Sequence, residues 1–220
     1  MHIHNLSESP SILNQFISEI RDVRIQKDRM RFRRNIERIG EILAYELSKS
    51  LSFAENKTKT PLGMAKTPLV EDEVVICSIL RAGLPLHRGL LNYFDQADNT
   101  FISAYRHHHK SDPKKFEVIV EYLASPSLEG KTLIIADPML ASGKSMVMVN
   151  EALQGMGTPK EIHLVSVVGA LTGVEYAASN FSEDTHLWIA AIDPTLNDYG
   201  YIVPGLGDAG DLSFGNKVQH

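Results

Sequence analysis

The stretch that decides the fold is "ADPMLASGKS", Ala136–Ser145, preceded by the apolar "KTLII" and followed by the helix-like "MVMVNEALQGM". In an open α/β sheet, ligands gather outside the carboxyl ends of the strands, and Asp137 is expected to end one such strand. The N–H groups of residues 141–145 would then lie at a helix N-terminus, where unsatisfied donors and the helix dipole favour an anion. The stretch therefore predicts a phosphate-binding loop or, alternatively, an ordinary strand-to-helix turn capped by Ser142.

Short apolar runs alternate with helical patterns through much of the remaining chain. Such strands, separated by helices, are typical of a parallel sheet that is covered on both faces. The segment "FEVIVEY", residues 116–122, alternates differently and predicts a strand with one face toward water. We therefore predict a single α/β domain over residues 1–220. The expected strands are residues 74–80, 100–105, 133–136, 162–168 and 187–192, and the expected helices are residues 84–93, 145–154 and 172–180.

The N-terminal part of the chain is expected to be helical over about residues 11–53. Ile36, Ile39 and Leu43 recur at spacings of three and four, and we expect a break near Lys27. A basic run in this region is interpreted as a solvated helix face or a subunit contact, with RNA binding as the alternative. The run consists of Arg21, Arg24, Lys27, Arg29, Arg31, Arg33 and Arg34.

The composition excludes several classes of protein. With 220 residues, 43% of them hydrophobic, the chain can bury an ample core. Its net charge of −5 argues against a general nucleic-acid binder. The single Cys77 cannot form an internal disulfide, so a reducing, cytoplasmic setting is the default expectation. No apolar run approaches the ~18 residues of a membrane span, and the polar start "MHIHNLSESP" does not fit a signal peptide.

Four other patterns invite functional interpretations that their context does not favour. "SGKS" resembles a Walker loop, but the position five residues before Gly143 is Pro138 rather than glycine. "GLGDAG", residues 205–210, matches a dinucleotide motif but is followed by ten residues, too few for that fold. "RHHHK", residues 106–110, is expected to be a solvated, mobile loop rather than a metal site. Cys77 lies inside an apolar strand and is expected to be a core residue.

Three segments together closely resemble the uracil phosphoribosyltransferases. They are "SILRAGLPL" (residues 78–86), "DPMLASGKS" (137–145) and "YGYIVPGLGDAGDLSFG" (199–215), and the resemblance covers nearly the whole chain in order. It implies a type I phosphoribosyltransferase fold with a β-arm and a C-terminal base-binding hood. The implied reaction joins uracil to phosphoribosyl pyrophosphate, giving UMP and pyrophosphate with Mg²⁺ present.

The resemblance also implies a binding site for phosphoribosyl pyrophosphate. Guanidinium groups at Arg81 and Arg106 suit pyrophosphate because they bind oxyanions bidentately, although either could instead form a surface ion pair. Asp137 would bind the ribose hydroxyls or, alternatively, cap a helix. Ser142 and Lys144 depart from the family loop, which more often has Thr before the glycine and a small residue after it. The implied residues are Arg81, Arg106, Asp137, Pro138, Met139, Leu140, Ala141, Ser142, Gly143, Lys144, Ser145 and Asp208.

The C-terminal segment would read the base through main-chain groups of Ile202, Gly207, Asp208 and Ala209. Glycines at positions 205, 207 and 210 are expected to allow close approach and positive φ; the alternative is a flexible glycine-rich tail. Tyr201, Ile202, Val203 and Phe214 argue for packing, because they would be costly to expose. Asp208 is also the candidate catalytic acid, either ordering the Mg²⁺ shell or orienting uracil, and no direct protein ligand to the metal is expected.

Partners and rival functions complete the expectations. Residues 55–70 predict a loop or β-arm that a partner subunit would cover, which favours a homo-oligomer such as a dimer or tetramer. GTP is a further expected effector, since it activates some relatives. Residues 106–115 are expected to close over phosphoribosyl pyrophosphate. The rival functions are a regulatory RNA-binding protein on the same scaffold and an enzyme for another base, such as orotate or hypoxanthine.

Overall fold

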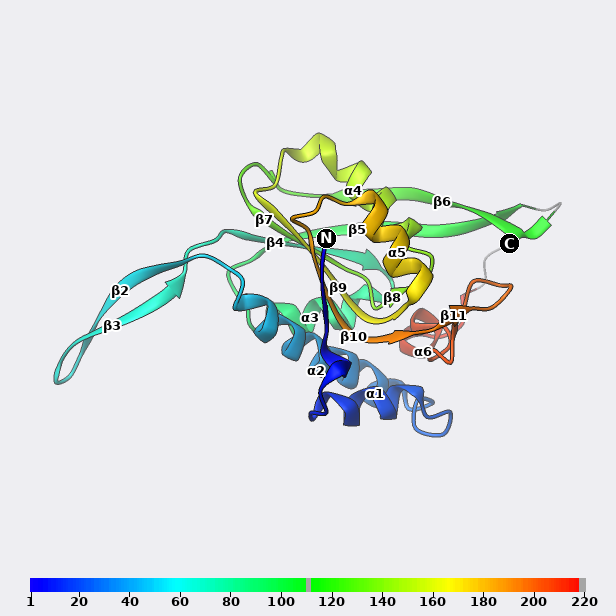
Figure 1. Ribbon diagram of the computed structural model, residues 1–220, viewed down its shortest axis with the longest axis horizontal. Coiled ribbons are helices and arrows are strands. Elements are labelled where there is room, and N and C mark those ends of the chain that lie inside the picture. The colour runs from blue at the N-terminus through cyan, green and yellow to red at the C-terminus, as the bar shows by residue number, and fades with distance from the viewer. Residues whose placement is uncertain (110–111, 218–220) are drawn as a thin grey trace.

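A mixed, mostly parallel sheet runs through the molecule, with helices on both of its faces (Figure 1). The computed structural model describes residues 1–109 and 112–217, and within residues 104–121 it describes the course of the backbone alone. The strands of this sheet are β1 (His2–Asn5), β4 (Val74–Leu80), β5 (Asp98–His109), β6 (Asp112–Ala124), β7 (Thr132–Ala136), β8 (Met139–Leu140), β9 (Glu161–Ala170) and β10 (His186–Asp193). Their order is β1-β10-β9-β7-β4-β5-β6, with β8 paired to β9; β6 runs antiparallel to β5, and the other pairs are parallel.

The five strands predicted from apolar runs are confirmed: one has the expected ends, three are one to three residues longer, and β5 is six residues longer. All five residues of β7 are buried, as are six of the seven in β4, which is the pattern of parallel strands covered on both faces. β1 was not predicted, because its sequence "HIHN" is short and carries a single apolar residue, Ile3. It extends the sheet by pairing with β10.

The sheet divides the core into two halves, and each half is covered by helices. α1 (Leu13–Arg21), α2 (Arg29–Ser48) and α3 (Gly83–Leu91) cover one face, and α4 (Lys144–Leu153) and α5 (Leu171–Asn180) cover the other (Figure 1). The predicted break near Lys27 is confirmed, because α1 ends at Arg21 and Asp28 caps α2 by accepting a hydrogen bond from Arg31 N at 3.0 Å. None of the helices in the described part of the chain has the length and hydrophobicity that crossing a membrane requires.

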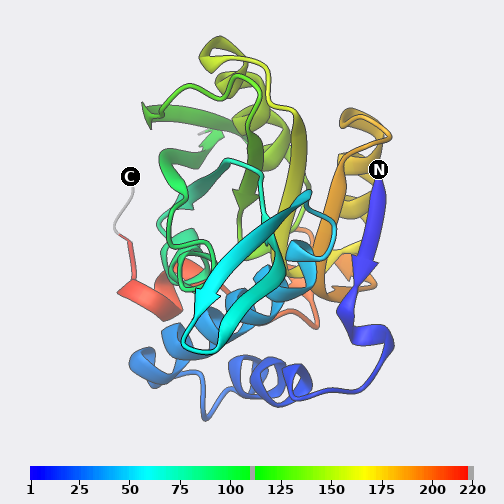
Figure 2. The same cartoon turned by 90° about the vertical axis from the view of Figure 1, so that its left-hand side faces the viewer.

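A two-stranded arm projects from the body of the molecule (Figures 1 and 2). It consists of β2 (Phe53–Thr60) and β3 (Gly63–Val70), paired antiparallel, so the predicted β-arm is confirmed. Leu62 at its tip is 100% exposed and Met64 is 62% exposed. The arm therefore presents apolar side chains to its surroundings.

The hairpin of β5 and β6 corrects one expectation. Residues 106–109 lie within β5 and residues 112–115 lie within β6, so the prediction of a loop there was wrong; Lys110 and Ser111 lie outside the described residues. The reason is cross-strand pairing, since the register continues from Arg106↔Val118 to His108↔Phe116. Arg106 consequently lies inside its strand rather than after it. Tyr122, which belongs to the apolar set of the alternating segment, is exposed, and the burial of residues 116–121 lies outside the described part of the chain, so the expected water-facing side of this strand stays a prediction.

The basic run is largely neutralised by contacts within the chain. Among these contacts, Arg31 forms an ion pair with Glu19 at 2.9 Å, and hydrogen bonds from Arg31 and Asn35 lower the pKa of Glu19 to about 2. This arrangement favours the interpretation as a helix face over RNA binding, which requires cations available to phosphates. The other contacts are Arg21–Asp193, Arg24–Asp22, Arg34–Glu37 and Arg33 to the carbonyl of Ser213.

Candidate functional site

The loop between β7 and α4 has the geometry expected of an anion site. Asp137 directly follows β7, and α4 begins at Lys144 with Gly143 at its N-cap position. Gly143 has φ +78°, a left-handed conformation that favours glycine, and no side-chain hydrogen bond caps α4 among the described residues. The alternative of a turn capped by Ser142 was therefore wrong, because the N-cap of this ten-residue helix is Gly143, which has no side chain.

Asp137 is fixed by contacts on both sides of its backbone. Its N–H donates to the carbonyl of Val165 at 3.1 Å, and its own carbonyl accepts a hydrogen bond from Ser166 Oγ at 2.6 Å. Its Oδ1 accepts from Met139 N at 3.1 Å, so the carboxylate stabilises a local turn rather than capping a helix. Sequence reasoning did not identify Ser166, although a lone hydroxyl in the apolar run of β9 was a usable signal.

Arg81 lies at the same edge of the sheet as Asp137. It follows β4, which pairs with β7 in the register Ser78↔Ala136, so the two residues follow neighbouring strands. The peptide bond between Leu80 and Arg81 is cis. The Arg81 side chain is 43% exposed and forms an ion pair with Asp211 Oδ1 at 3.2 Å, which is the surface ion pair given above as the alternative to pyrophosphate binding.

The C-terminal segment folds over this edge. It forms β11 (Thr195–Leu196), β12 (Ile202–Val203) and α6 (Ala209–Phe214), so the alternative of an unstructured tail was wrong. Ile202 is 4% exposed and Ala209 is 3% exposed, and both belong to the core on the α2 side of the sheet. The packing expected of Tyr201, Val203 and Phe214 was overestimated, because these three side chains are exposed.

Two of the three expected glycine roles are confirmed. Gly205 has φ +57° and Gly207 has φ +94°, whereas Gly210 lies in α6 and does not need positive φ. A Cβ on Gly210 would lie 3.2 Å from Asp208 Oδ1, so its role is close packing. Asp208 caps α6 by accepting a hydrogen bond from Asp211 N at 2.9 Å.

A hollow of about 330 Å³ opens beside this segment. Its lining includes Gly207, Asp208 and Asp211 of the C-terminal segment, Gln26 and Lys27 of the connection between α1 and α2, and Arg29 at the start of α2. Asp208 also lies 3.4 Å from Lys217 Nζ. Two of the residues predicted to read the base thus border a space where a small molecule could lie.

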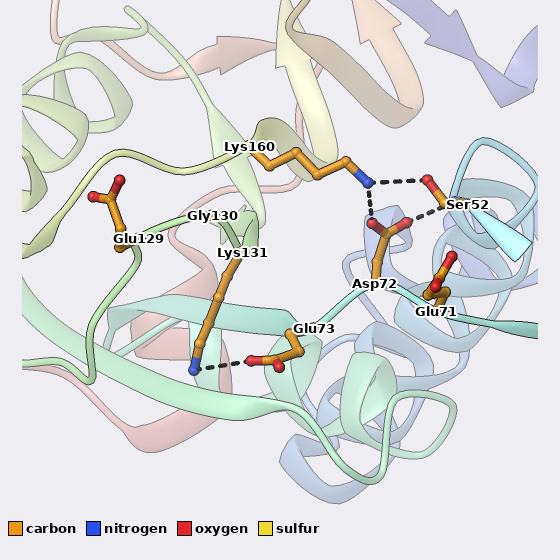
Figure 3. Close-up of a pocket in the computed structure, with 8 residues that line it drawn as sticks. All are labelled: Ser52, Glu71, Asp72, Glu73, Glu129, Gly130, Lys131 and Lys160. Carbon is orange, nitrogen blue, oxygen red and sulfur yellow. Dashed lines mark hydrogen bonds and ion pairs between the residues drawn. The ribbon is translucent and has the colours of Figure 1, made fainter. Parts of the chain in front are cut away.

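A second hollow, of about 340 Å³, lies at the opposite edge of the sheet and is bordered by charged pairs (Figure 3). Lys160 hydrogen-bonds to Ser52 Oγ at 3.0 Å and forms an ion pair with Asp72, whose side chain is 4% exposed. Burial acts to raise the pKa of Asp72, but the hydrogen bonds from Lys160 and Ser52 N hold it below its ordinary value. Glu73 pairs with Lys131 at 3.6 Å. These residues precede β4, β7 and β9 or border the arm, so the hollow lies between the arm and the amino ends of the strands. Open α/β sheets bind their ligands at the opposite, carboxyl ends of the strands.

The structure therefore brings Asp137, residues 138–145, Arg81 and Asp208 to one edge of the sheet. Arg106 belongs to β5, the neighbour of β4, and the structure describes only its backbone. Cys77 is fully buried in β4, where burial raises the pKa of its thiol to about 12, so the expectation of a core residue is confirmed.

Comparison with known proteins identifies related chains. The family model of uracil phosphoribosyltransferase matches residues 7–216. The uracil phosphoribosyltransferase of Porphyromonas gingivalis is 50% identical over 218 residues, covering 99% of this chain and 100% of the relative. That of Pyrococcus furiosus is 36% identical over 220 residues, covering 99% of this chain and 91% of the relative. Among solved structures, the AQ2163 protein from Aquifex aeolicus superposes with a TM-score of 0.85 at 28% identity, covering 99% of this chain and 100% of that chain.

Proposed function

The chain belongs to the uracil phosphoribosyltransferase family, and we propose that the carboxyl edge of its sheet is where the family reaction takes place. The chain is a pentosyltransferase that transfers the phosphoribosyl group of phosphoribosyl pyrophosphate to uracil, giving UMP and pyrophosphate. Its α/β fold is the type I phosphoribosyltransferase fold. The observation that carries the site assignment is the left-handed Gly143 at the start of α4, which places the N-terminus of that helix beside Asp137 at the carboxyl edge of the sheet.

The loop is proposed to hold the phosphoribosyl part of the substrate. N–H groups of residues 142–145 would bind the 5′-phosphate, each dipole contact contributing about 0.3–1 kcal/mol. The N–H of Ala141, which was also expected to take part, instead donates to the Met139 carbonyl at 3.0 Å. The Asp137 carboxylate would accept hydrogen bonds from the ribose hydroxyls, and its backbone contacts with Val165 and Ser166 keep it in place. Pro138, Met139 and Leu140 shape the turn that connects these two parts.

Arg81 and Arg106 are proposed to bind the pyrophosphate. In the structure, Arg81 contacts the Asp211 carboxylate at 3.2 Å and the Gly215 carbonyl at 3.1 Å. Both contacts are to oxygen atoms, so pyrophosphate oxygens can replace them; the new hydrogen bonds would be charge-assisted, as the one to Asp211 already is. Substrate binding would therefore exchange an internal contact of Arg81 for one with the leaving group.

Mg²⁺ is proposed as the cofactor, and the oxygen-rich rim of the site fits it. Asp137 and Asp208 provide hard carboxylate oxygens there, while the described residues contain no group of three or more His, Cys, Asp or Glu side chains arranged to hold a metal ion. Mg²⁺ prefers octahedral coordination by phosphate oxygens and water, with one or two carboxylates nearby. When bound, it supplies positive charge to the pyrophosphate oxygens. Asp137 and Asp208 would hydrogen-bond its water ligands.

Uracil is proposed to lie against Ile202 and residues 207–209. The base presents an edge of carbonyl, N–H and carbonyl, which backbone groups can read directly. Asp208 would orient the base or the metal-bound waters, because its bond to Asp211 N fixes the carboxylate at the start of α6. Positioning and charge stabilisation then account for most of the catalysis, since positive charge builds on the ribose as pyrophosphate leaves.

We also propose that the chain forms a homo-oligomer in which a second copy covers the arm. Support comes from the exposed apolar side chains of the arm, which include Phe53, Leu62, Met64 and Leu69. Exposed apolar surface of this kind is typical of protein contacts. Activation by GTP is a further proposal that rests on the family alone, and comparing the reaction rate with and without GTP tests it.

The deciding experiment is direct. The purified protein is incubated with phosphoribosyl pyrophosphate, Mg²⁺ and one of uracil, orotate, hypoxanthine or cytosine, and the nucleotide formed is identified by chromatography. UMP from the uracil reaction alone is the expected result. Formation of a different nucleotide, or of none, would contradict the assignment.

A further inference from the structure

The turn at residues 205–207 is held by side chains that lie outside the phosphate and base motifs. We propose that Arg21, Gln26 and Asp193 are positioning residues that fix this turn and thereby set the affinity for uracil. The proposal rests on the proposed function, which places residues 207–209 at the base.

The first contact is a partly buried ion pair that bonds both polar backbone groups of Gly205. Asp193 is the last residue of β10, and its Oδ2 accepts a hydrogen bond from Gly205 N at 2.9 Å. Arg21, the last residue of α1, donates to the two carboxylate oxygens of Asp193 at 2.8 and 2.9 Å. The same guanidinium donates to the Gly205 carbonyl at 3.2 Å. A bidentate pair holds the guanidinium and the carboxylate in one plane. The Arg21–Asp193 pair therefore determines how the peptide groups on both sides of Gly205 are oriented.

The second contact reaches the next residue of the turn. Gln26 Nε2 donates to the Ile20 carbonyl at 2.9 Å and to the Leu206 carbonyl at 3.2 Å. The Ile20 carbonyl is one of the last four of α1, which lack helical partners. One amide group therefore ties the end of α1 to the base-reading turn. Gln26 also lines the hollow of about 330 Å³ that Gly207 and Asp208 border.

These contacts matter because the turn contains two glycines. Gly205 and Gly207 both adopt positive φ, and glycine has more conformational freedom to lose than any other residue. A base read by backbone groups binds tightly where those groups are already in place, since ordering them on binding would weaken affinity. The phosphate loop has a separate support in Val165 and Ser166. Loss of the Arg21–Gln26–Asp193 contacts should therefore raise KM for uracil more than KM for phosphoribosyl pyrophosphate.

The test compares matched variants in steady-state kinetics. Gln26→Met keeps the side-chain length and removes the donor, and Arg21→Lys keeps the charge and removes the bidentate contact. The controls are Gln15→Met and Arg24→Lys, whose side chains contact Glu19 and Asp22 on the exposed surface. We expect KM for uracil to rise about 3-fold to 10-fold in both test variants, the effect of one lost hydrogen bond. KM for phosphoribosyl pyrophosphate should rise by less than KM for uracil, and the melting temperature should stay at the values of the controls.

Two results would overturn the proposal. One is an unchanged KM for uracil in both test variants; the other is a parallel rise in both KM values with a lower melting temperature, which indicates a general structural role. Gly207→Ala separates this failure from failure of the site assignment, because it alters the base-reading turn itself at φ +94°. If Gly207→Ala raises KM for uracil while Gln26→Met and Arg21→Lys do not, the positioning role alone is wrong. If none of the three variants changes it, the turn does not bind uracil.

Discussion

Gly173 of α5 lies against Leu140 in the phosphate loop, so close that a Cβ on the glycine would be 2.7 Å from the Leu140 carbonyl oxygen. The same Cβ would lie 2.8 Å from the carbonyl carbon of Ala141. Both neighbours are backbone atoms, which cannot move aside as a flexible side chain can. The position of the proposed phosphate site therefore depends on the absence of a side chain in a neighbouring helix.

Gly173→Ala should displace the phosphate loop. A loop moved by a fraction of an ångström misplaces the bound ribose, so we expect kcat/KM for phosphoribosyl pyrophosphate to fall about 10-fold to 100-fold. Steady-state kinetics at saturating uracil measure it. Gly155→Ala is the matched control, because nothing lies within 4 Å of a Cβ at that position. Equal kinetics in the two variants would show that the loop tolerates the displacement.

Asp137→Asn tests the ribose contact. Replacing the carboxylate by an amide removes a charged hydrogen bond worth about 1.5–3 kcal/mol, so kcat/KM should fall ten-fold or more. Asp95→Asn, at an exposed position, is the control. Unchanged kinetics with a normal circular dichroism spectrum would assign Asp137 to the local turn with Met139 alone.

The oligomer proposal predicts a response to charge on the arm. Met64→Asp and Leu69→Asp should each convert the oligomer to smaller species, because a buried unpaired carboxylate is costly in an interface. Ile12→Asp, an exposed apolar position of the N-terminal segment, should not. Sedimentation velocity measures the size of the particles. A monomeric wild type would contradict the proposal, and so would the same oligomer in the wild type and all three variants.

The sequence predicted the central sheet well because its strands are continuous apolar runs. β4 and β7 are almost entirely buried, so burial alone fixed their type and approximate ends. β1 was missed because an edge strand of four residues has no apolar pattern, and it depends on pairing with β10. The hairpin at residues 106–109 and 112–115 was read as a loop for a similar reason: its polar residues form strands through pairing across the hairpin. The closure of that segment over the substrate stays a prediction.

The candidate site was predicted where local chemistry marks it, as at Asp137 and Gly143. Its supports were not predictable, because they come from residues distant in the chain. Asp193 is separated from Arg21 by 172 positions, and Ser166 from Asp137 by 29. Such pairs become visible when the fold brings strand ends together. Ser142 was read as a possible helix cap by residue type, whereas the left-handed conformation of Gly143 placed the cap one residue later.

His163 should make the protein less stable in acid. It is fully buried, and Trp188 Nε1 donates to its Nδ1 at 3.1 Å. Burial, together with the nearby His186, lowers the pKa of His163 from 6.5 to about 3. The unfolded chain therefore binds this proton first, so the free energy of unfolding should fall as pH drops from 6.5 toward 3. One proton contributes at most about 1.4 kcal/mol per pH unit.

His163→Gln removes this titration and keeps an acceptor for Trp188. Urea unfolding at several pH values, followed by the fluorescence of the single Trp188, measures the free energy of unfolding. The variant should lose less stability than the wild type below about pH 6, while the two curves should be parallel above about pH 7.5. Parallel curves over the whole range would show that His163 does not contribute to the acid sensitivity.

Base selectivity tests the assignment of Ile202 and residues 207–209 to uracil. Cytosine presents an amino donor where uracil has a carbonyl, and an acceptor where uracil has an N–H. Two backbone groups of the site would then face a like partner and stay unpaired in a buried setting. Sites that read hydrogen-bonding groups in this way reject the wrong analogue by about 10⁴-fold or more, beyond what pocket size alone achieves.

The measurement uses three bases at a fixed concentration of phosphoribosyl pyrophosphate and follows pyrophosphate release. 5-Fluorouracil keeps the edge that the backbone reads and adds one small atom on the far side of the ring, so it should react like uracil, while cytosine should not react detectably. Because both analogues are close to uracil in size, a difference between them isolates hydrogen bonding from fit. Reaction of cytosine at the rate of uracil, or no reaction of 5-fluorouracil, would mean that another part of the chain recognises the base.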